Sequence, residues 1–435
     1  MAGAMRGFLL GLAGLVVALG MTAAGGRAYA KDLKDPQHHV LVMLRLPPAH
    51  VRAGSDYGGG YGDGMGNSMR RRVVSRLARA HGLSLVDDWP MPLAGVHCFV
   101  LASVADTPIE VLAAALSREP GVLWSEPMTF YRVQGGRARV TLNAVDDPLF
   151  AAQPAAREWR LAELYRVATG RGVRVAVIDS MVEATHPDLV GQVEVARNFV
   201  AGRTAPPEQH GTNVAGIIAA KANNGVGIAG VAPRSRLMAL RACWQQGAPP
   251  GKPPTTVCDS LSLAKALTFA IEHDAQVINM SLSGPPSRLL ARLLDAAQSR
   301  EITVVGAYDR DLPKGGFPAS HAGVVAVAEE TSGALPAGVY GAPGRDAPTT
   351  QPGGRWALAN GSSIAAAHVS GLFALLREHG DSATRSLARL AVRPGGAVVD
   401  ACMTILRGPG PCDGAGGGAS DIRRTFDASR PPLAR

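Results

Sequence analysis

Three short segments of the 435-residue chain carry side chains that together could supply a carboxylate, a base and a nucleophile. Asp179 ends an apolar run, His210 opens an apolar helical pattern, and Ser363 precedes a second helical pattern. A serine hydroxyl is a weak nucleophile until an imidazole accepts its proton, and the imidazole needs a buried carboxylate to hold its tautomer. The three residues therefore predict nucleophilic catalysis, with Asp179 orienting, His210 transferring protons and Ser363 attacking.

Apolar runs and helical patterns alternate from about residue 147 to residue 376. The strand-like runs span 173–178, 237–241, 277–280, 303–305 and 323–327, and the helix-like stretches span 213–221, 261–273, 288–300 and 364–378. Uninterrupted apolar strands separated by helices are typical of a parallel sheet covered on both faces. The predicted fold class is α/β with a doubly wound parallel sheet. Functional residues of such sheets gather at the carboxyl ends of the strands, where Asp179 stands.

The segment from residue 38 to residue 133 has a different pattern. It predicts strands at 39–46, 83–86, 96–101 and 122–131, with helices at 70–81 and 108–118. This order, βαββαβ, is that of a small ferredoxin-like α+β domain. The Gly/Tyr-rich stretch 54–66 predicts a surface loop, and the aperiodic stretch 135–147 predicts a domain boundary that a protease would cut.

The first 30 residues have the pattern of an export signal. Arg6 precedes an apolar run from residue 8 to residue 19, and Ala28-Tyr29-Ala30 forms a small-x-small cleavage site. An uncleaved anchor is the second interpretation, because a membrane span needs about 20 apolar residues. We expect export to the periplasm or the extracellular space, with no membrane contact after the signal is removed.

Charge and composition exclude several classes of protein. The formal net charge of +9 and the pI near 9.6 come mostly from arginines that are spread along the chain. No basic stripe or binding motif accompanies them, so we expect no nucleic-acid partner. A content of 46% hydrophobic and 18% charged residues excludes wholesale disorder and a multi-span membrane protein.

Five cysteines are consistent with an oxidising compartment. Cys243 and Cys258 bracket one loop, and Cys402 and Cys412 bracket another, each at a spacing that suits a local disulfide. Cys98 is then left unpaired. We hypothesise that the region containing Cys98 is discarded from the mature protein.

Longer stretches around the three candidate residues resemble the signature blocks of the subtilase family. These blocks are Val175-Ala176-Val177-Ile178-Asp179 with His186-Pro187-Asp188-Leu189, His210-Gly211-Thr212-Asn213-Val214-Ala215-Gly216, and Gly361-Ser362-Ser363-Ile364-Ala365-Ala366-Ala367-His368-Val369-Ser370-Gly371. The order Asp, His, Ser along the chain is also that of subtilisin, a member of this family. The resemblance covers about residues 147–376. It implies a subtilisin-like sheet and a serine endopeptidase that cleaves polypeptides through an acyl-enzyme on Ser363, with no cofactor for catalysis.

The resemblance also assigns roles outside the candidate triad. Ser281, Leu282, Ser283 and Gly284 correspond to an edge strand that pairs with the substrate backbone. Residues 38–133 resemble an inhibitory propeptide, which assists folding and keeps its tail in the active site until it is cut. The expected domains are a signal peptide (1–30), a propeptide (31–140), a catalytic domain (141–400), and a C-terminal disulfide loop with a disordered tail (401–435).

One departure from the family pattern concerns the oxyanion. The family supplies a donor from an Asn that follows the strand here at 303–305, where this chain has Tyr308 and Asp309. Losing that donor costs about 10²- to 10³-fold in turnover, as measured in subtilisin, a relative. The Tyr308 hydroxyl could donate, whereas an ionised Asp309 can only accept. The alternative function is therefore a catalytically weakened or silent subtilase-fold protein that binds peptides or assists folding.

Two further interpretations concern a metal site and a different class of hydrolase. Asp188 and Asn224 line up with a structural calcium site of many relatives, where oxygen ligands suit a hard cation, although a plain turn explains the same residues. An esterase or lipase is disfavoured, because no Gly-x-Ser-x-Gly elbow begins the order Ser, Asp, His.

Overall fold

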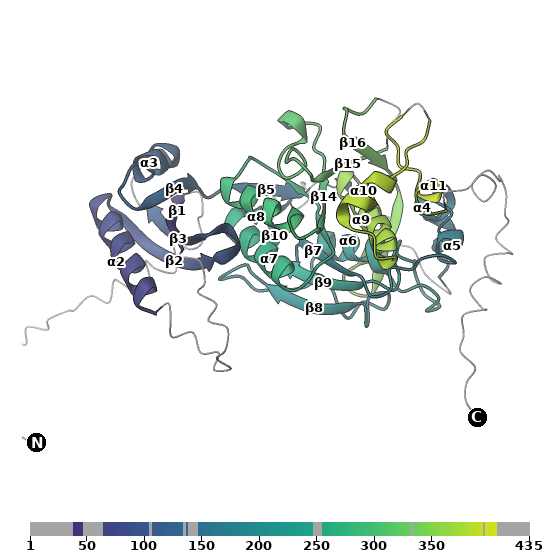
Figure 1. The fold of residues 1–435 in the computed structure, drawn as a ribbon. Coiled ribbons are helices and arrows are strands. Elements are labelled where there is room, and N and C mark those ends of the chain that lie inside the picture. Colours follow the sequence, from purple (N-terminus) through teal and green to yellow (C-terminus); the bar gives the residue numbers. More distant parts are fainter. Residues whose placement is uncertain are drawn as a thin grey trace, which may run out of the picture.

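The structure is a computed structural model that describes residues 38–46, 64–103, 107–133, 136–137, 147–246, 255–330, 334–394 and 396–406. The predicted signal peptide, Cys412 and the C-terminal tail lie outside these ranges, as does most of the loop predicted at 54–66. Figure 1 shows a small N-terminal α+β domain beside a larger α/β domain. No helix within the described ranges has the length and apolar character needed to cross a membrane.

The larger domain is built on a seven-stranded sheet with the order β16-β15-β14-β12-β7-β9-β8. Its strands are β7 (Arg174–Asp179), β8 (Val193–Asn198), β9 (Arg236–Arg241), β12 (Val277–Met280), β14 (Thr303–Ala307), β15 (Val325–Glu329) and β16 (Val339–Ala342). All neighbouring strands in it are parallel. The predicted doubly wound parallel sheet is confirmed. The strand order reverses at β7, which is where ligands bind in such sheets.

Helices cover both faces of this sheet (Figure 1). They are α6 (Gln209–Ala219), α7 (Ser260–Glu272), α8 (Arg288–Gln298) and α9 (Ser362–Glu378). Successive side chains of a strand point to opposite faces. Val175 and Val177 of β7 therefore pack with α6 and α9, whereas Ala176 and Ile178 pack with α7 and α8. This double burial explains why the strands have uninterrupted apolar sequences.

The N-terminal domain has an antiparallel sheet of order β2-β3-β1-β4. Its elements are β1 (His39–Arg45), α2 (Gly64–Ala80), β2 (Leu83–Met91), β3 (Val96–Ser103), α3 (Ile109–Leu116) and β4 (Val122–Pro127), in the predicted βαββαβ order. One face of the sheet packs on α2 and α3. The other face, which includes Leu41, Cys98 and Trp124, joins the apolar cluster of α7 and α8.

The strand expected at 122–131 is in fact two strands in two sheets. β4 ends at Pro127, whose missing N–H cannot extend the ladder. The chain then forms β5 (Phe130–Val133), which belongs to a four-stranded sheet of order β10-β11-β5-β13. The other members are β10 (Cys243–Gln246), β11 (Thr255–Asp259) and β13 (Leu282–Ser283). β5 thus leaves its own domain and pairs with the larger one.

Short elements complete the larger domain. They are β6 (Gly136–Arg137), α4 (Pro154–Glu158), α5 (Leu161–Leu164), β17 (Ala347–Gln351), β18 (Arg355–Asn360), α10 (Ala383–Arg389) and α11 (Ala401–Leu406). Side chains of α11, including Ala401 and Ile405, join the core that contains α9. The core therefore continues past residue 400, the expected end of the catalytic domain.

The expected disulfide between Cys243 and Cys258 is present and joins β10 to β11 at a directly opposed pair. Cys402 is also disulfide-bonded, whereas Cys412, its expected partner, lies outside the described residues. Cys98 is a free and buried cysteine, and burial raises the pKa of its thiol. The thiol is therefore protonated and inert at neutral pH while the domain is folded.

Candidate active site

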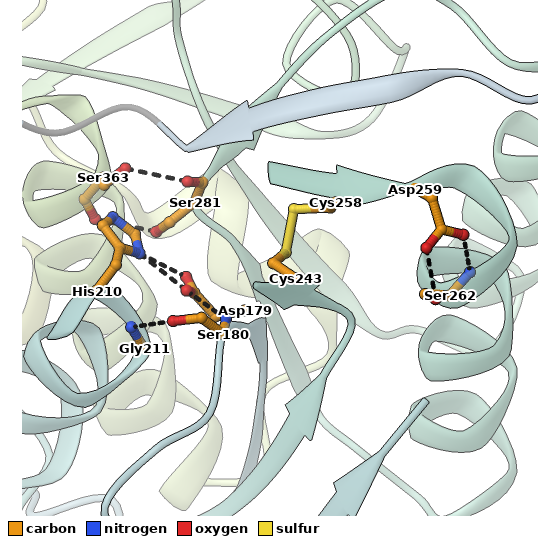
Figure 2. Close-up of a disulfide and its surroundings, with 10 residues drawn as sticks. All are labelled: Asp179, Ser180, His210, Gly211, Cys243, Cys258, Asp259, Ser262, Ser281 and Ser363. Carbon is orange, nitrogen blue, oxygen red and sulfur yellow. Dashed lines mark hydrogen bonds and ion pairs between the residues drawn. A yellow bond between two sulfur atoms is a disulfide. The ribbon is translucent and has the colours of Figure 1, made fainter. Parts of the chain in front are cut away.

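Asp179 and His210 are in contact at the carboxyl end of β7 (Figure 2). Asp179 is the last residue of the strand and is 1% exposed, and Nδ1 of His210 lies 2.9 Å from both of its carboxylate oxygens. Asp179 Oδ1 also accepts the backbone N–H of Ser180 at 2.6 Å. Because an ionised carboxylate can only accept, Nδ1 must carry the proton, and Nε2 is left as the acceptor that a general base needs.

Ser363 is the second residue of α9, which lies against α6, and Figure 2 shows the imidazole of His210 next to it. The Ser363 Oγ donates to the backbone carbonyl of Ser281 at 3.0 Å. Nε2 of His210 is buried and has no hydrogen-bond partner among the described residues. The serine hydroxyl must therefore rotate about its Cα–Cβ bond to reach the imidazole.

A buried polar network holds the backbone at Ser363. Ser281 Oγ donates to the Ser363 carbonyl at 3.0 Å, and Asn279 Nδ2 donates to Ser281 Oγ at 2.9 Å. Ser370, two turns along α9, donates to Asn279 Oδ1 at 2.9 Å. The start of α9 is thus tied to β12 at two levels. In the sequence, Asn279 lies in the strand predicted at 277–280 and Ser370 lies in the third signature block, but nothing there assigned them a role.

A buried ion pair beside Asp179 was also missed by the sequence patterns. Arg241 ends β9 opposite Asp179, and its Nη2 lies 3.5 Å from Glu208 Oε1, with both side chains buried. Burial raises the pKa of Glu208, and the charge of Asp179 raises it further, while burial lowers the pKa of Arg241. Glu208 directly precedes α6, so the pair fixes where the helix that carries His210 begins. Arg and Glu are rarely buried, and no sequence pattern marked them.

The expected substrate strand is occupied by the chain itself. β5 lies antiparallel between β11 and β13, with Arg132 opposite both Val257 and Ser283 and with Val133 opposite Leu282. Of the four residues assigned to this strand, Leu282 and Ser283 form β13, Ser281 contacts Ser363, and Gly284 pairs with Phe317. The cleft therefore binds an extended segment by strand addition.

The chain continues past Ser363 as β6. Gly136 and Arg137 pair with Asn360 and Ala359 of β18, a strand that ends three residues before Ser363. β5 ends at Val133 beside β13, on the side of Ser281. The two strands thus flank the candidate triad, and the short connection between Val133 and Gly136 joins them.

The N-terminal domain also contacts α7 and α8 directly. Glu126 accepts hydrogen bonds from Ser287 Oγ at 2.9 Å and from the Arg288 N–H at 3.2 Å, at the positive end of α8. The guanidinium groups of Arg288 and Arg292 lie 4.6 and 4.4 Å from the ring centre of Trp124. These contacts attach the domain independently of β5.

The two candidate oxyanion residues follow β14. The ring of Tyr308 lies against Gly315, where an added Cβ would come within 2.1 Å of the ring, and its N–H donates to Val327 O. Asp309 is buried, and its Oδ1 accepts the N–H of Asp311 at 2.9 Å. Its carboxylate is an acceptor in that bond, so Tyr308 remains the candidate side-chain donor.

Asp188 and Asn224 are brought together, but as a hydrogen-bonded pair. Asn224 Nδ2 donates to Asp188 Oδ1 at 2.8 Å, and Oδ2 accepts the Ile228 N–H at 3.0 Å and the Trp356 indole N–H at 2.6 Å. Calcium requires oxygen ligands, whereas the donors here are all N–H groups. The described residues contain no group of three or more His, Cys, Asp or Glu that could hold a metal. The predicted pair, as arranged, does not fit a calcium ion.

His368, in the third signature block, makes the fold sensitive to acid. It is fully buried in α9, with Nδ1 2.9 Å from Ile364 O, and burial lowers its pKa from 6.5 to about 4. Between these values the unfolded chain binds a proton that the folded chain does not. We therefore expect the contribution of His368 to the free energy of unfolding to fall by about 3 kcal/mol as the pH drops from 6.5 to 4, and to stay constant below that range.

Urea unfolding of the Ser363→Ala protein, which cannot digest itself, measures this effect between pH 4 and pH 7.5. The same protein carrying His368→Gln isolates the contribution of the imidazole, because the other titrating groups are shared. If the two proteins lose stability in parallel over this range, burial of His368 is not the cause.

Comparison with known proteins places this site in a family. Residues 170–393 match the subtilase family. A thermophilic serine proteinase of Bacillus sp. (strain AK1) is 37% identical over 221 residues, which are 48% of this chain and 53% of that protein. Thermitase of Thermoactinomyces vulgaris is 30% identical over 258 residues, 56% of this chain and 89% of thermitase. The chain spans about half the length of the first of these relatives.

A solved structure shares the fold. Fervidolysin from Fervidobacterium pennivorans, described as a keratinolytic enzyme related to subtilisin, superposes with a TM-score of 0.63 at 22% sequence identity. The match covers 86% of this chain and 61% of fervidolysin. With its parallel sheet and the family match over more than half of its residues, the chain therefore belongs to the subtilase family of serine proteases.

Proposed function

We propose that this protein is a serine endopeptidase that cleaves extended polypeptide segments through Asp179, His210 and Ser363. The observation that carries the proposal is β5, an extended segment bound between β11 and β13 beside Ser363 and His210. A peptide bound in this way presents its backbone to the nucleophile without help from its side chains.

The reaction follows from the site. Ser363 Oγ attacks the peptide carbonyl carbon while Nε2 of His210 takes the hydroxyl proton, and the imidazolium then protonates the departing amine. The acyl-enzyme is hydrolysed by water, which His210 deprotonates in turn. Asp179 stays ionised and holds the imidazole through Nδ1. Backbone N–H groups at the start of α9 stabilise the oxyanion, Tyr308 being the candidate for a second donor. No step requires a cofactor.

We further propose that the N-terminal domain is an inhibitory propeptide of an exported precursor. Its tail lies in the cleft as β5, and Glu126 and Trp124 attach it to α8. Self-cleavage would occur between Val133, the last residue of β5, and Gly136, the first residue of β6, at the start of the boundary expected at 135–147. Release of this domain would remove Cys98 from the mature protein. Export to the periplasm or beyond rests on the sequence of residues 1–30.

A fluorophosphonate probe distinguishes an active peptidase from a silent peptide-binding protein. We expect the folded protein, freed of its N-terminal domain, to be labelled on Ser363, because this serine lies next to an imidazole with an open Nε2. Labelling should disappear in Ser363→Ala and persist in Ser362→Ala, which changes the neighbouring serine. An unlabelled wild-type protein of native stability would instead support the silent protein.

A further inference from the structure

We propose that the hairpin of β10 and β11 forms a separate binding subsite for an aromatic side chain of the substrate, on the amino-terminal side of the cleaved bond. This inference rests on the proposed peptidase function and specifies which substrates the site selects. The occupant in the structure is Phe130 of β5, which packs against a small apolar cluster of the larger domain.

Three residues form the wall of this subsite. They are Val200 in the loop after β8, Trp244 of β10 and Val257 of β11, which are 5%, 4% and 7% exposed in the presence of Phe130. The guanidinium of Arg203 lies over the Trp244 ring, 4.5 Å from the ring centre. The wall therefore combines two branched aliphatic side chains with an indole that a guanidinium contacts. Such a surface suits a flat apolar side chain.

Strand register explains why Phe130 reaches this wall. Trp244 is opposite Val257, and Val257 is opposite Arg132, so these side chains share one face of the small sheet. Phe130 is two residues before Arg132 and points to the same face. Any substrate that pairs with β11 in this register presents its corresponding side chain to Trp244.

Tyr131 points to the opposite face and occupies a different pocket. It is fully buried, its ring centre is 6.3 Å from that of Phe317, and Gly284 leaves it room, since an added Cβ would lie 2.5 Å from the ring. Two adjacent aromatic residues are thus held on the two faces of one strand. The Phe130 subsite and the Tyr131 pocket can be tested separately, because they share no wall residue.

The disulfide stabilises the hairpin that forms the new subsite. Cys243 and Cys258 are the sequence neighbours of Trp244 and Val257, and their bond ties β10 directly to β11. Without β10, β11 would be the edge of the sheet, and the subsite would keep Val257 but lose the indole of Trp244. The subsite is therefore a property of the whole disulfide-linked hairpin.

The test uses internally quenched peptides with the sequence of residues 128–139. We expect Phe130→Ala in the peptide to lower kcat/KM of the wild-type enzyme by about 10-fold, as for losing one partly buried aromatic side chain. With the Trp244→Ala enzyme, the two peptides should differ by less than about threefold. Tyr131→Ala in the peptide should impair cleavage by both enzymes, and Arg132→Ala, which alters an exposed side chain, should have little effect on either.

The inference is wrong if the wild-type enzyme does not distinguish the native peptide from its Phe130→Ala form, or if Trp244→Ala distinguishes them equally well. Thermal unfolding checks that this variant is folded. Val200→Ser, outside the disulfide hairpin, provides a second variant that should reduce the discrimination.

Binding of the same peptides to Ser363→Ala protein that has been freed of its N-terminal domain separates this inference from the proposed function. One outcome is that the variant binds the Phe130 peptide more tightly, in a way that depends on Trp244, while the wild-type protein cleaves no peptide. This outcome would support the subsite and overturn the proposed peptidase function. Cleavage by the wild-type protein without any preference for Phe130 would support the peptidase function and overturn the subsite.

Discussion

Ser363→Ala is expected to lower kcat for peptide hydrolysis by about 10⁶-fold, which is the loss measured when the nucleophile of subtilisin, a relative, is removed. The variant keeps His210 and Asp179 but has no atom that can form the acyl-enzyme. Hydrolysis of the residue 128–139 peptide by protein freed of its N-terminal domain gives the value, and Ser362→Ala is the matched control. A loss below about 10²-fold would mean that Ser363 is not the nucleophile.

The same variant should remain an uncut precursor, because the bond that is to be cut would meet no nucleophile. Intact mass measures this directly, since it reports the N-terminal domain, the signal and the disulfides together. Processing of Ser363→Ala as complete as that of the wild type would show that another protease matures the chain, even if the peptide assay confirms Ser363 as the nucleophile.

Asp179→Asn is expected to lower kcat by about 10⁴-fold, while the protein stays folded. An amide that donates toward Nδ1 of His210 would move the imidazole proton to Nε2, the nitrogen that must accept from Ser363. The peptide assay at neutral pH measures the effect. Asp188→Asn is the control, because it also changes a buried carboxylate, and it should lower thermal stability with kcat within about threefold of wild type. An Asp179→Asn enzyme within about tenfold of wild type would exclude Asp179 as the orienting residue.

The elements that carry the candidate triad could be predicted because their signals are local. Asp179 ends an apolar strand, and Ser363 starts an apolar helix, so an uninterrupted apolar run locates the first and a helical period the second within a few residues. The seven-stranded sheet confirmed the fold class that these patterns indicated. Edge strands such as β8 were missed because their exposed residues interrupt the apolar pattern.

The parts that could not be predicted depend on distant partners. Phe130 was assigned to the strand that begins at Val122, yet it pairs with Asp259, more than a hundred residues away. Arg241 ends the strand predicted at 237–241, and its contacts with Glu208 and Asn198 accompany its burial. Trp244 lies in a loop-like stretch with no period. For Asn224 the residue type suggested a metal ligand, whereas the structure shows its amide N–H donating to Asp188.

The position of β5 inside a sheet sets a condition on any protein that is to be cut. A strand that pairs on both edges, with β11 and with β13, must expose its N–H and C=O groups on both sides. A segment within a folded substrate meets this requirement only while it is locally open. Every 1.4 kcal/mol that a substrate gains in local stability would therefore reduce cleavage about tenfold when opening is fast. If the protein is the proposed endopeptidase, it would therefore cut a misfolded or newly exported chain faster than a compactly folded protein that contains the same cleavable sequence.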